Sequence, residues 1–476
     1  MRKTTDNYLI EIFCRQMRKL ILTTDFRSRD QTGDDTRSRT VQNPYKMEKK
    51  AKARCQKIPI WHILKMKIAI IGGGAAGLAA LKHSLDEHHE CELFEQTGLI
   101  GGTWNYSEKI GIDENGLPIH SSMYKGLRTN LPKELMQLED FPFSKPDYSY
   151  VSQPQVLEYI NDYANHFNLL SHVQFFKHVI KVTPLERGKW SVEIKDVKSK
   201  LSETKTFDAI FVCIGNYSTP FIPKFPGIEN FQGTIIHSHD YRKPDRYKNR
   251  KVLIVGAGPS GIDIGRIISK VSDNVSICHR SPPYVSLPIP EELKKKIPIQ
   301  EFRQHSVLFS DGSEENVEDV ILCTGYLYNY PFLSNECEIK VENKWVKYLY
   351  KHIININHPT MAFIGIPTRV FPFVLFGIQI RFFLAYLKGN FSISKDKMME
   401  DLETYMNNRK AEGQTAPHFL SLKQGEYMED LGTIARIKKV PPVFAKLYKY
   451  VHKEGIGNIA TYKILNDNDF EIVKFV

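Results

Sequence analysis

The stretch KIAIIGGGAAG, residues 67–77, has the pattern of a short buried strand that runs directly into a glycine loop. A helical pattern, LAALKHSLDEH, follows at 78–88, and CELFEQ at 91–96 has the composition of a second strand. Glu95 stands near the end of that strand, 18 residues after Gly77. Strand, GxGxxG loop, helix, strand and acid in this order predict a dinucleotide-binding βαβ unit.

The same order recurs later in the chain. KVLIV at 251–255 runs into the loop GAGPSG, a helical pattern and a strand, NVSICHR, which ends on Arg280 rather than on an acid. A carboxylate such as Glu95 accepts hydrogen bonds from ribose hydroxyls, whereas an arginine pairs with a 2'-phosphate. The first unit is therefore expected to bind FAD and the second NADPH. A solvated surface arginine is the alternative interpretation of Arg280.

Each glycine of the two loops has a mechanical reason. The first allows a tight turn, the second lets a pyrophosphate approach the backbone, and the third lets the helix pack close to the sheet. The phosphates then meet the positive end of a helix. The loop residues expected to bind the cofactors are Gly72, Gly73, Gly74, Ala75, Ala76 and Gly77 for FAD, and Gly256, Gly258 and Gly261 for NADPH.

Two later apolar segments also resemble each other. DAIFVCIG at 208–215 and EDVILCTG at 318–325 are both apolar strands that close on a glycine. The fold class is therefore α/β, with two Rossmann-like domains, the NADPH domain being inserted into the FAD domain. The expected boundaries are a basic disordered extension at 1–66, a first segment of the FAD domain at 67–219, the NADPH domain at 220–318, and a second segment of the FAD domain with C-terminal helices at 319–476.

Composition excludes several classes of protein. With 42% apolar and 25% charged residues, the 476-residue chain is typical of a globular protein. The formal charge is +11, but residues 1–66 hold 16 basic and 7 acidic residues, so that the rest carries only +2. A nucleic-acid partner is not expected, because a binding face needs its basic excess on the folded domain. The seven cysteines form neither a CxxC pair nor a zinc-ligand spacing, so no metal site or redox disulfide is expected.

The apolar run at 370–387 raises the question of a membrane. It contains Pro372, Gln379 and Arg381, which favours a buried helix near a cofactor over a transmembrane span. No signal peptide is recognised. The expected location is cytoplasmic, with peripheral association with the endoplasmic reticulum as an alternative, and Met66 is a second candidate start of the functional polypeptide.

Four motifs together resemble the flavin-containing monooxygenases of the dimethylaniline monooxygenase type. FQGTIIHSHDY at 231–241 fits that family's pattern F-x-G-x-x-x-H-x-x-x-[FY], and its final tyrosine stands where Baeyer-Villiger enzymes carry tryptophan. LCTGY at 322–326 is similar to the family's FATGY, EQTGLIGGTW at 95–104 resembles its flavin segment, and YKGLRTNLPKELM at 124–136 resembles the segment with its active-site asparagine. The resemblance covers 67–476 and is particularly close to the insect N-oxygenases that act on alkaloids.

The resemblance implies a reaction. NADPH would reduce FAD, oxygen would add to form a C4a-hydroperoxyflavin, and retained NADP+ would shield it until a soft nitrogen or sulfur nucleophile takes up oxygen. Asn130 would be the catalytic residue, unless it only caps a helix. The family positions map onto Glu95, Gln96, Thr103, Trp104, Thr129, Asn130, Leu131 and Gln379 on the FAD side, and onto Ser260, Ile262 and Asp263 on the NADP side.

Some alternatives stay open at this point. Gln379 is either close to the flavin or a hydrogen-bonded core residue. His237 either holds the two cofactor domains in register or acts as a general acid or base. The partners are a small nucleophilic substrate and O2, and a homodimer is neither required nor excluded. An NADPH oxidase or reductase that does not oxygenate a substrate shares every glycine loop, and so does a redox-state binding protein without catalysis.

Overall fold

The computed structural model describes residues 65–144, 146–279, 289–342, 344–414, 416–454 and 460–475. The chain divides into two compact units, residues 1–63 and 64–476, and all described residues belong to the second. Apart from Lys65 and Met66, the predicted basic extension lies outside the described residues.

The first sheet contains the strands expected from the first glycine unit. Its order is β20-β21-β22-β7-β1-β2-β3, and β1 is parallel to both β2 and β7. The strands are β1 (Lys67–Ile71), β2 (Glu90–Phe94), β3 (Val173–Gln174), β7 (Ala209–Val212), β20 (Leu349–Tyr350), β21 (Ile354–Asn355) and β22 (Met361–Phe363). The glycine loop leads from β1 into helix α3 (Ala75–Asp86), as predicted. We call the portion of the chain built on this sheet the first lobe.

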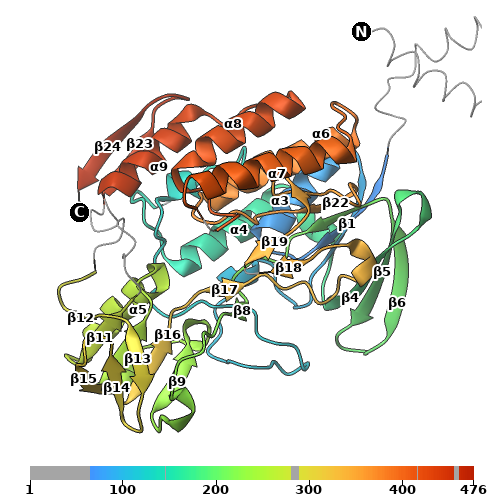
Figure 1. The fold of residues 1–476 in the computed structure, drawn as a ribbon. Coiled ribbons are helices and arrows are strands. Elements are labelled where there is room, and N and C mark those ends of the chain that lie inside the picture. Colours follow the sequence, from blue (N-terminus) through green and yellow to red (C-terminus); the bar gives the residue numbers. More distant parts are fainter. Residues whose placement is uncertain are drawn as a thin grey trace, which may run out of the picture. The chain divides into compact units, whose positions relative to one another are not determined.

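The second sheet has the order β12-β11-β10-β16-β9, and its neighbouring strands are parallel. The strands are β9 (Thr234–His237), β10 (Val252–Val255), β11 (Val275–Cys278), β12 (Lys294–Lys296) and β16 (Asp319–Leu322). Helix α5 (Pro259–Ser269) follows the second glycine loop. This second lobe, green to yellow in Figure 1, therefore repeats the βαβ core of the first.

The boundary expected at residue 318 is wrong by several residues. Strand β16 pairs with β10 and β9, so EDVILCTG completes the second sheet instead of returning the chain to the first. The two crossings between the lobes are the short strands β8 (Thr219–Pro220) and β17 (Tyr326–Leu327), which pair with each other in antiparallel fashion. The LCTGY motif leads into this ribbon, since Phe221 N donates to Gly325 O at 2.9 Å.

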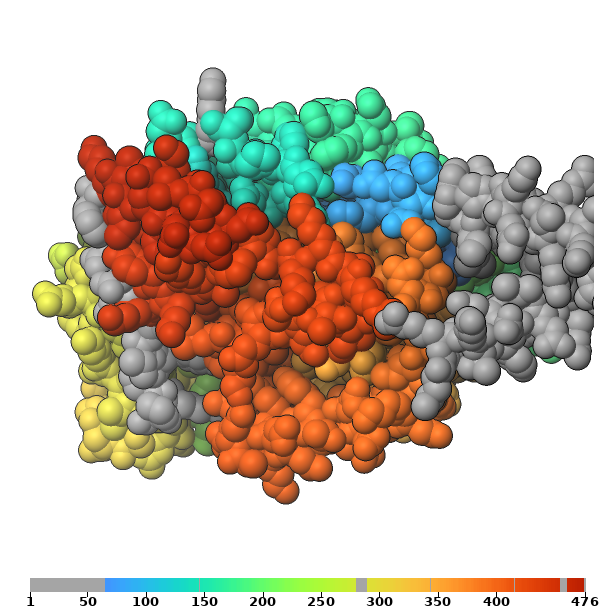
Figure 2. All heavy atoms as spheres, turned by 90° about the horizontal axis from the view of Figure 1, so that it is seen from above, coloured from blue at the N-terminus to red at the C-terminus, as the bar shows by residue number. Residues whose placement is uncertain are grey.

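Helices from the C-terminal third pack on the first lobe (Figure 1). Contacts join α3 to α6 and α6 to α8. These helices are α6 (Pro372–Leu387), α7 (Lys395–Ala411), α8 (Gln424–Ala435) and α9 (Pro442–Glu454), whereas α4 (Gln153–His166) comes earlier in the chain. Figure 2 shows the face on which the C-terminal segments, orange to red, lie beside earlier segments of the first lobe. The apolar run predicted to form a buried helix is α6, and most of its side chains are buried.

The remaining strands form small antiparallel sheets outside the two parallel sheets. They are β4 (Lys177–Pro184), β5 (Trp190–Asp196), β6 (Ser202–Phe207), β13 (Ile299–Phe302), β14 (Ser306–Phe309), β15 (Glu314–Asn316), β18 (Val341–Glu342), β19 (Trp345–Val346), β23 (Ala460–Ile464) and β24 (Phe470–Phe475). In the part of the chain that the structure describes, no helix is both long enough and apolar enough to cross a membrane.

Candidate cofactor and active site

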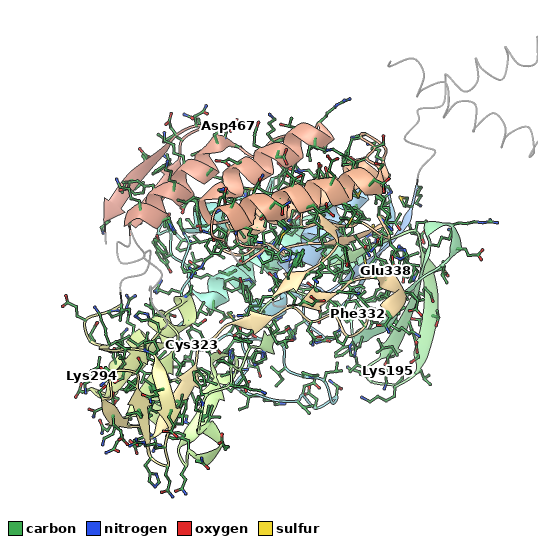
Figure 3. The ribbon with its side chains drawn as sticks, in the orientation of Figure 1. Lys195, Lys294, Cys323, Phe332, Glu338 and Asp467 are labelled. Atoms are coloured by element: carbon green, nitrogen blue, oxygen red, sulfur yellow. The ribbon has the colours of Figure 1, made fainter. Side chains whose placement is uncertain are left out.

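The first glycine of each loop is required by the backbone. Gly72 and Gly256 have φ values of +105° and +114°, which side chains rarely tolerate. A Cβ at Gly72 would lie 2.6 Å from Cys213 O, and one at Gly256 would lie 2.4 Å from Cys323 O. Cys213 and Cys323 each follow the strand next to the loop, β7 and β16, and Figure 3 labels Cys323. The two loops therefore turn in the same way against equivalent strands.

The third glycines allow each helix to start close to its loop. A Cβ at Gly77 would lie 1.9 Å from Gly72 O, and a Cβ at Gly261 would lie 1.8 Å from Gly256 O. Real Cβ atoms do not approach other atoms so closely. These two positions therefore serve packing within each unit, as the spacing predicted.

The second glycines face open space. A Cβ at Gly258 would meet nothing within 4 Å, and one at Gly74 would meet only Gly102, at 3.6 Å and beyond. Gly74 and Gly258 are also the N-cap residues of α3 and α5, and neither helix has a side-chain cap. The first-turn N–H groups of a helix need acceptors, and the helix dipole favours an anion there. Both loops thus fit the pyrophosphate of a dinucleotide.

Glu95 is buried beside the first loop. Its Oε2 accepts a hydrogen bond from Gly73 N at 2.8 Å, and its Oε1 accepts from Thr97 N and Thr97 Oγ1, both at 2.8 Å. A Cβ at Gly73 would lie 3.0–3.2 Å from the Glu95 side chain, so this glycine makes room for the carboxylate. A carboxylate has about four acceptor sites, so Glu95 keeps acceptor capacity for a ribose hydroxyl.

The predicted flavin segment lies against the same loop. Gly101 N donates to Gly73 O at 2.9 Å, and a Cβ at Gly102 would lie 3.0 Å from Gly74 Cα. The 3-10 helix η2 (Gly102–Trp104) follows, and Thr103 Oγ1 is buried there with no hydrogen-bond partner among the described residues. Trp104 is partly buried against the core, and Gln96 is partly exposed next to Glu95. The structure therefore brings together two segments that are distinct in the sequence.

Asn130 is exposed on a loop whose backbone is anchored. Thr129 N donates to Val151 O at 2.9 Å, while Thr129 Oγ1 is buried without a partner among the described residues. The 3-10 helix η3 (Lys133–Leu135) has Pro132 as its N-cap, so Asn130 does not cap it. Leu131 packs against the core of the first lobe. The helix-capping alternative is thus excluded, and the carboxamide of Asn130 is accessible.

Gln379 is fully buried in α6. Its Oε1 accepts from Gly365 N and its Nε2 donates to the Tyr427 hydroxyl, both at 2.9 Å. These are the contacts of a hydrogen-bonded core residue, one of the two alternatives, and Gly365 follows β22 of the first sheet. A contact between Gln379 and the flavin stays a prediction.

On the second lobe, Ser260 and Ile262 lie on the first turns of α5, as the resemblance implies. Asp263 is partly buried and accepts a hydrogen bond from the Tyr124 hydroxyl of the first lobe at 2.6 Å. Burial raises the pKa of the Asp263 carboxyl above its ordinary value, although the bond from Tyr124 lowers it. Arg280 lies outside the described residues, so its pairing with a 2'-phosphate stays a prediction.

His237 ends strand β9 and is buried. Burial lowers its pKa to about 4, so the ring is neutral near pH 7. His239 N donates to His237 Nδ1 at 3.0 Å, which places the proton of the neutral ring on Nε2. The ring packs edge-on against Tyr326 of β17, with centroids 5.2 Å apart. These contacts favour a structural role at the junction of the lobes over acid or base catalysis.

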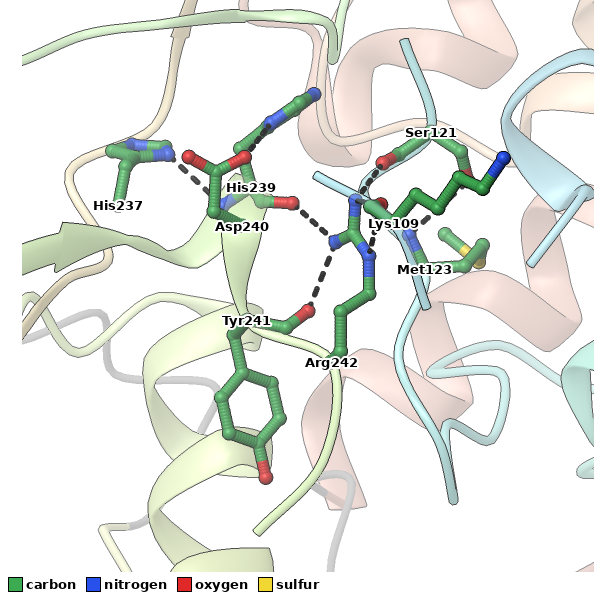
Figure 4. A network of polar contacts seen from close by, with 8 residues as sticks. All are labelled: Lys109, Ser121, Met123, His237, His239, Asp240, Tyr241 and Arg242. Carbon is green, nitrogen blue, oxygen red and sulfur yellow. Dashed lines mark hydrogen bonds and ion pairs between the residues drawn. The ribbon is translucent and has the colours of Figure 1, made fainter. Parts of the chain in front are cut away.

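Two residues at the lobe junction were missed by sequence reasoning. Tyr124 opens the YKGLRTN stretch, and Arg242 directly follows the motif that ends at Tyr241. Arg242 is buried and donates to carbonyl groups on both sides of the junction (Figure 4). Its position next to the motif was the available signal.

The fold and the paired cradles define a two-dinucleotide flavoprotein, and comparison with known proteins identifies the family. The sequence matches the family described as flavin-binding monooxygenase-like over residues 65–293 and 285–451. It is 36% identical to flavin-containing monooxygenase FMO GS-OX5 of Arabidopsis thaliana over 79% of this chain and 86% of that protein. It is 32% identical to senecionine N-oxygenase of Tyria jacobaeae over 85% of this chain and 91% of that protein.

A solved structure agrees with the sequence comparison. S-allyl-L-cysteine S-oxygenase from Allium sativum superposes with a TM-score of 0.76 at 32% identity, covering 82% of this chain and 93% of that chain. The chain therefore belongs to the flavin-containing monooxygenase family. It is an oxidoreductase that uses FAD and NADP(H), as the resemblance implied.

Proposed function

We propose that this flavin monooxygenase uses NADPH and O2 to oxygenate a soft nitrogen or sulfur nucleophile. Its relatives support both choices of atom, since one is named an N-oxygenase and another an S-oxygenase. The observation that carries the proposal is the pair of open glycine cradles on two equivalent parallel sheets, because a reductant and a flavin must both be bound.

The first loop is assigned to FAD and the second to NADPH. Glu95 would accept hydrogen bonds from the FAD ribose, and Thr103 Oγ1 and Thr129 Oγ1, both buried without partners among the described residues, would find acceptors or donors on the same cofactor. Arg280 would select the 2'-phosphate of NADPH. The FAD domain then comprises residues from 67 to about 219 and from about 326 onward, on either side of the NADPH domain.

The chain's own groups would bind and orient the two cofactors and exclude water from them. The uncapped N–H groups of α3 and α5 would hold the two pyrophosphates. The accessible carboxamide of Asn130 can donate to and accept from the ligands at its loop. Bound FAD would supply the oxygen-transfer chemistry, through the C4a-hydroperoxyflavin that the resemblance implies. A small-molecule substrate is the expected partner.

Product analysis tests the proposal. The purified protein, loaded with FAD, is given NADPH and air with N,N-dimethylaniline, trimethylamine or methyl phenyl sulfide as probe. An N-oxide or sulfoxide formed in proportion to the NADPH consumed supports the proposal. If NADPH is oxidised with every probe but its electrons end in peroxide alone, the protein is an oxidase and the proposal is wrong.

A further inference from the structure

A segment of the first lobe, residues 106–128, contacts the second lobe, and Arg242 lies at this junction. Arg242 Nη1 donates to His239 O at 2.6 Å and to Tyr241 O at 3.0 Å, both in the second lobe. Its Nη2 donates to Ser121 O at 3.1 Å and to Lys109 O at 3.2 Å, both in the segment 106–128. Figure 4 shows the guanidinium between the two chain segments. One side chain thus joins backbone from both lobes.

The Arg242 contacts need a guanidinium rather than any cation. Arg242 is only 7% exposed, and burial lowers its pKa from the ordinary value. No carboxylate of the described residues lies within ion-pair distance of it, so carbonyl oxygens compensate the charge. Only the planar guanidinium offers five N–H donors in a fixed fork, whereas a lysine has three donors on one atom. A lysine at this position cannot bond all four carbonyl groups that Arg242 bonds.

Further hydrogen bonds connect the Arg242 contacts to the predicted flavin segment. The Ser121 hydroxyl donates to Thr103 O at 2.8 Å, so the residue held by Arg242 is bonded directly to η2. From the same segment, Lys125 N donates to Arg242 O at 2.8 Å. The junction is therefore linked by hydrogen bonds to the segment on which Thr103 and Trp104 are presented.

Tyr124 provides a second link between the lobes. Its hydroxyl donates to Asp263 on α5, and its ring packs against that of Tyr241, with centroids 5.4 Å apart and planes at 67°. Tyr124 is six residues from Asn130, and Gln153 N fixes the intervening backbone by donating to Leu127 O at 3.1 Å. A shift of the second lobe would therefore reach the loop of Asn130.

We propose that Arg242 is a positioning residue, which fixes the second lobe against segment 106–128 so that the nicotinamide and the flavin meet at the correct distance. The inference rests on the proposed assignment of the two loops to FAD and NADPH. Hydride transfer depends steeply on alignment, and a misplacement of about 1 Å can lower a rate roughly hundredfold. The rate of flavin reduction is therefore the property that Arg242 should control.

The test compares Arg242→Lys with a matched control, Lys243→Ala. Lys243 also joins the lobes, through an ion pair with Glu108 at 3.1 Å, but both side chains are exposed. Each FAD-loaded variant is mixed with saturating NADPH without oxygen, and flavin bleaching is followed by stopped flow. We expect the flavin of Arg242→Lys to be reduced roughly ten- to hundredfold more slowly. Its FAD content and circular-dichroism spectrum should match the wild type, while the lost hydrogen bonds lower its melting temperature. Lys243→Ala should remain within about twofold of wild type, as expected for an exposed ion pair.

Two outcomes overturn the inference: a wild-type reduction rate in Arg242→Lys at saturating NADPH, or an effect that appears only below saturation, as a raised dissociation constant for NADPH. If Arg242→Lys loses FAD or fails to fold, the same measurement is made on Tyr124→Phe. This change removes only the hydroxyl that donates to Asp263 across the junction and keeps the ring. An unchanged reduction rate in Tyr124→Phe then refutes the positioning role, and a lowered one supports it. The assay contains no oxygen, so it remains readable even if the wild type forms no oxygenated product and the proposed function fails.

Discussion

Replacing Gly258 with alanine should separate folding from NADPH binding. Gly258 has φ −83° and ψ −176°, an extended conformation that alanine adopts without strain. Its added methyl group would meet no protein atom within 4 Å. The methyl group would instead occupy the space that the pyrophosphate needs. Gly261→Ala is the matched contrast, since its methyl group would lie 1.8 Å from Gly256 O.

The structure sets the size of both effects. Where the backbone suits alanine, a Gly→Ala change stabilises a protein by about 0.4–1 kcal/mol, so Gly258→Ala should fold normally. A hydrogen bond from an N–H to a charged phosphate is worth about 1.5–3 kcal/mol, and losing one raises the dissociation constant roughly 10- to 150-fold. Gly261→Ala forces the backbone apart and should lower stability by about 1–3 kcal/mol or more.

The assay pairs thermal unfolding, followed by circular dichroism, with NADPH titration of the FAD-loaded protein. Gly74→Ala is the companion in the first loop, where the nearest atom to a Cβ is 3.6 Å away, and it should weaken FAD rather than NADPH binding. The reasoning is refuted if Gly258→Ala binds NADPH like the wild type. It is equally refuted if Gly258→Ala and Gly261→Ala are destabilised to the same extent.

Three other outcomes are expected. Asn130→Ala should leave the free energy of unfolding within about 0.5 kcal/mol of the wild-type value, because the side chain is exposed, yet lower the amount of product formed per NADPH in the product analysis proposed above. Gln379→Leu should lower the free energy of unfolding in urea by about 1–3 kcal/mol, because it leaves the part-buried Gly365 N–H without its acceptor, while the Tyr427 hydroxyl keeps its bond to Lys351 O; no loss would contradict these contacts. Burial lowers the pKa of His418 to about 3, so the unfolded chain binds one more proton at this residue below pH 6.5. The contribution of His418 to stability should therefore be complete above pH 6.5 and fall by about 1.4 kcal/mol per pH unit towards pH 3, so His418→Gln should make the measured slope shallower by about that amount.

Local patterns predicted the two βαβ units because their signal is contained in a few consecutive residues. The strand KIAII and the turns at Gly72 and Gly256 were confirmed, since apolar runs and φ-demanding glycines act over short distances. The boundary at residue 318 was wrong for the opposite reason. An apolar run predicts that EDVILCTG forms a strand, but its partner strands, β10 and β9, are chosen by packing with segments far away in the chain.

In the candidate site, too, local features could be predicted from the sequence and contacts between distant residues could not. The positions of the loops, of Glu95 and of the Asn130 loop followed from the motifs. The contacts of Arg242 could not be predicted, because its acceptors Lys109 and Ser121 lie 133 and 121 residues earlier in the chain. The partners of Gln379 were equally hidden, since composition indicates burial but not which backbone amide a carboxamide will bond.

The pairing of β8 with β17 brings the two ends of the second lobe together. Thr219 and Leu327 are partners in this ribbon, so the chain leaves and re-enters the first lobe at neighbouring points, about 5 Å apart between Cα atoms. A short turn between these two residues would close the chain without altering the strand order of the first sheet. The ribbon therefore brings both backbone attachments of the second lobe to one place, and the side-chain contacts of Arg242 and Tyr124 hold the lobe in position.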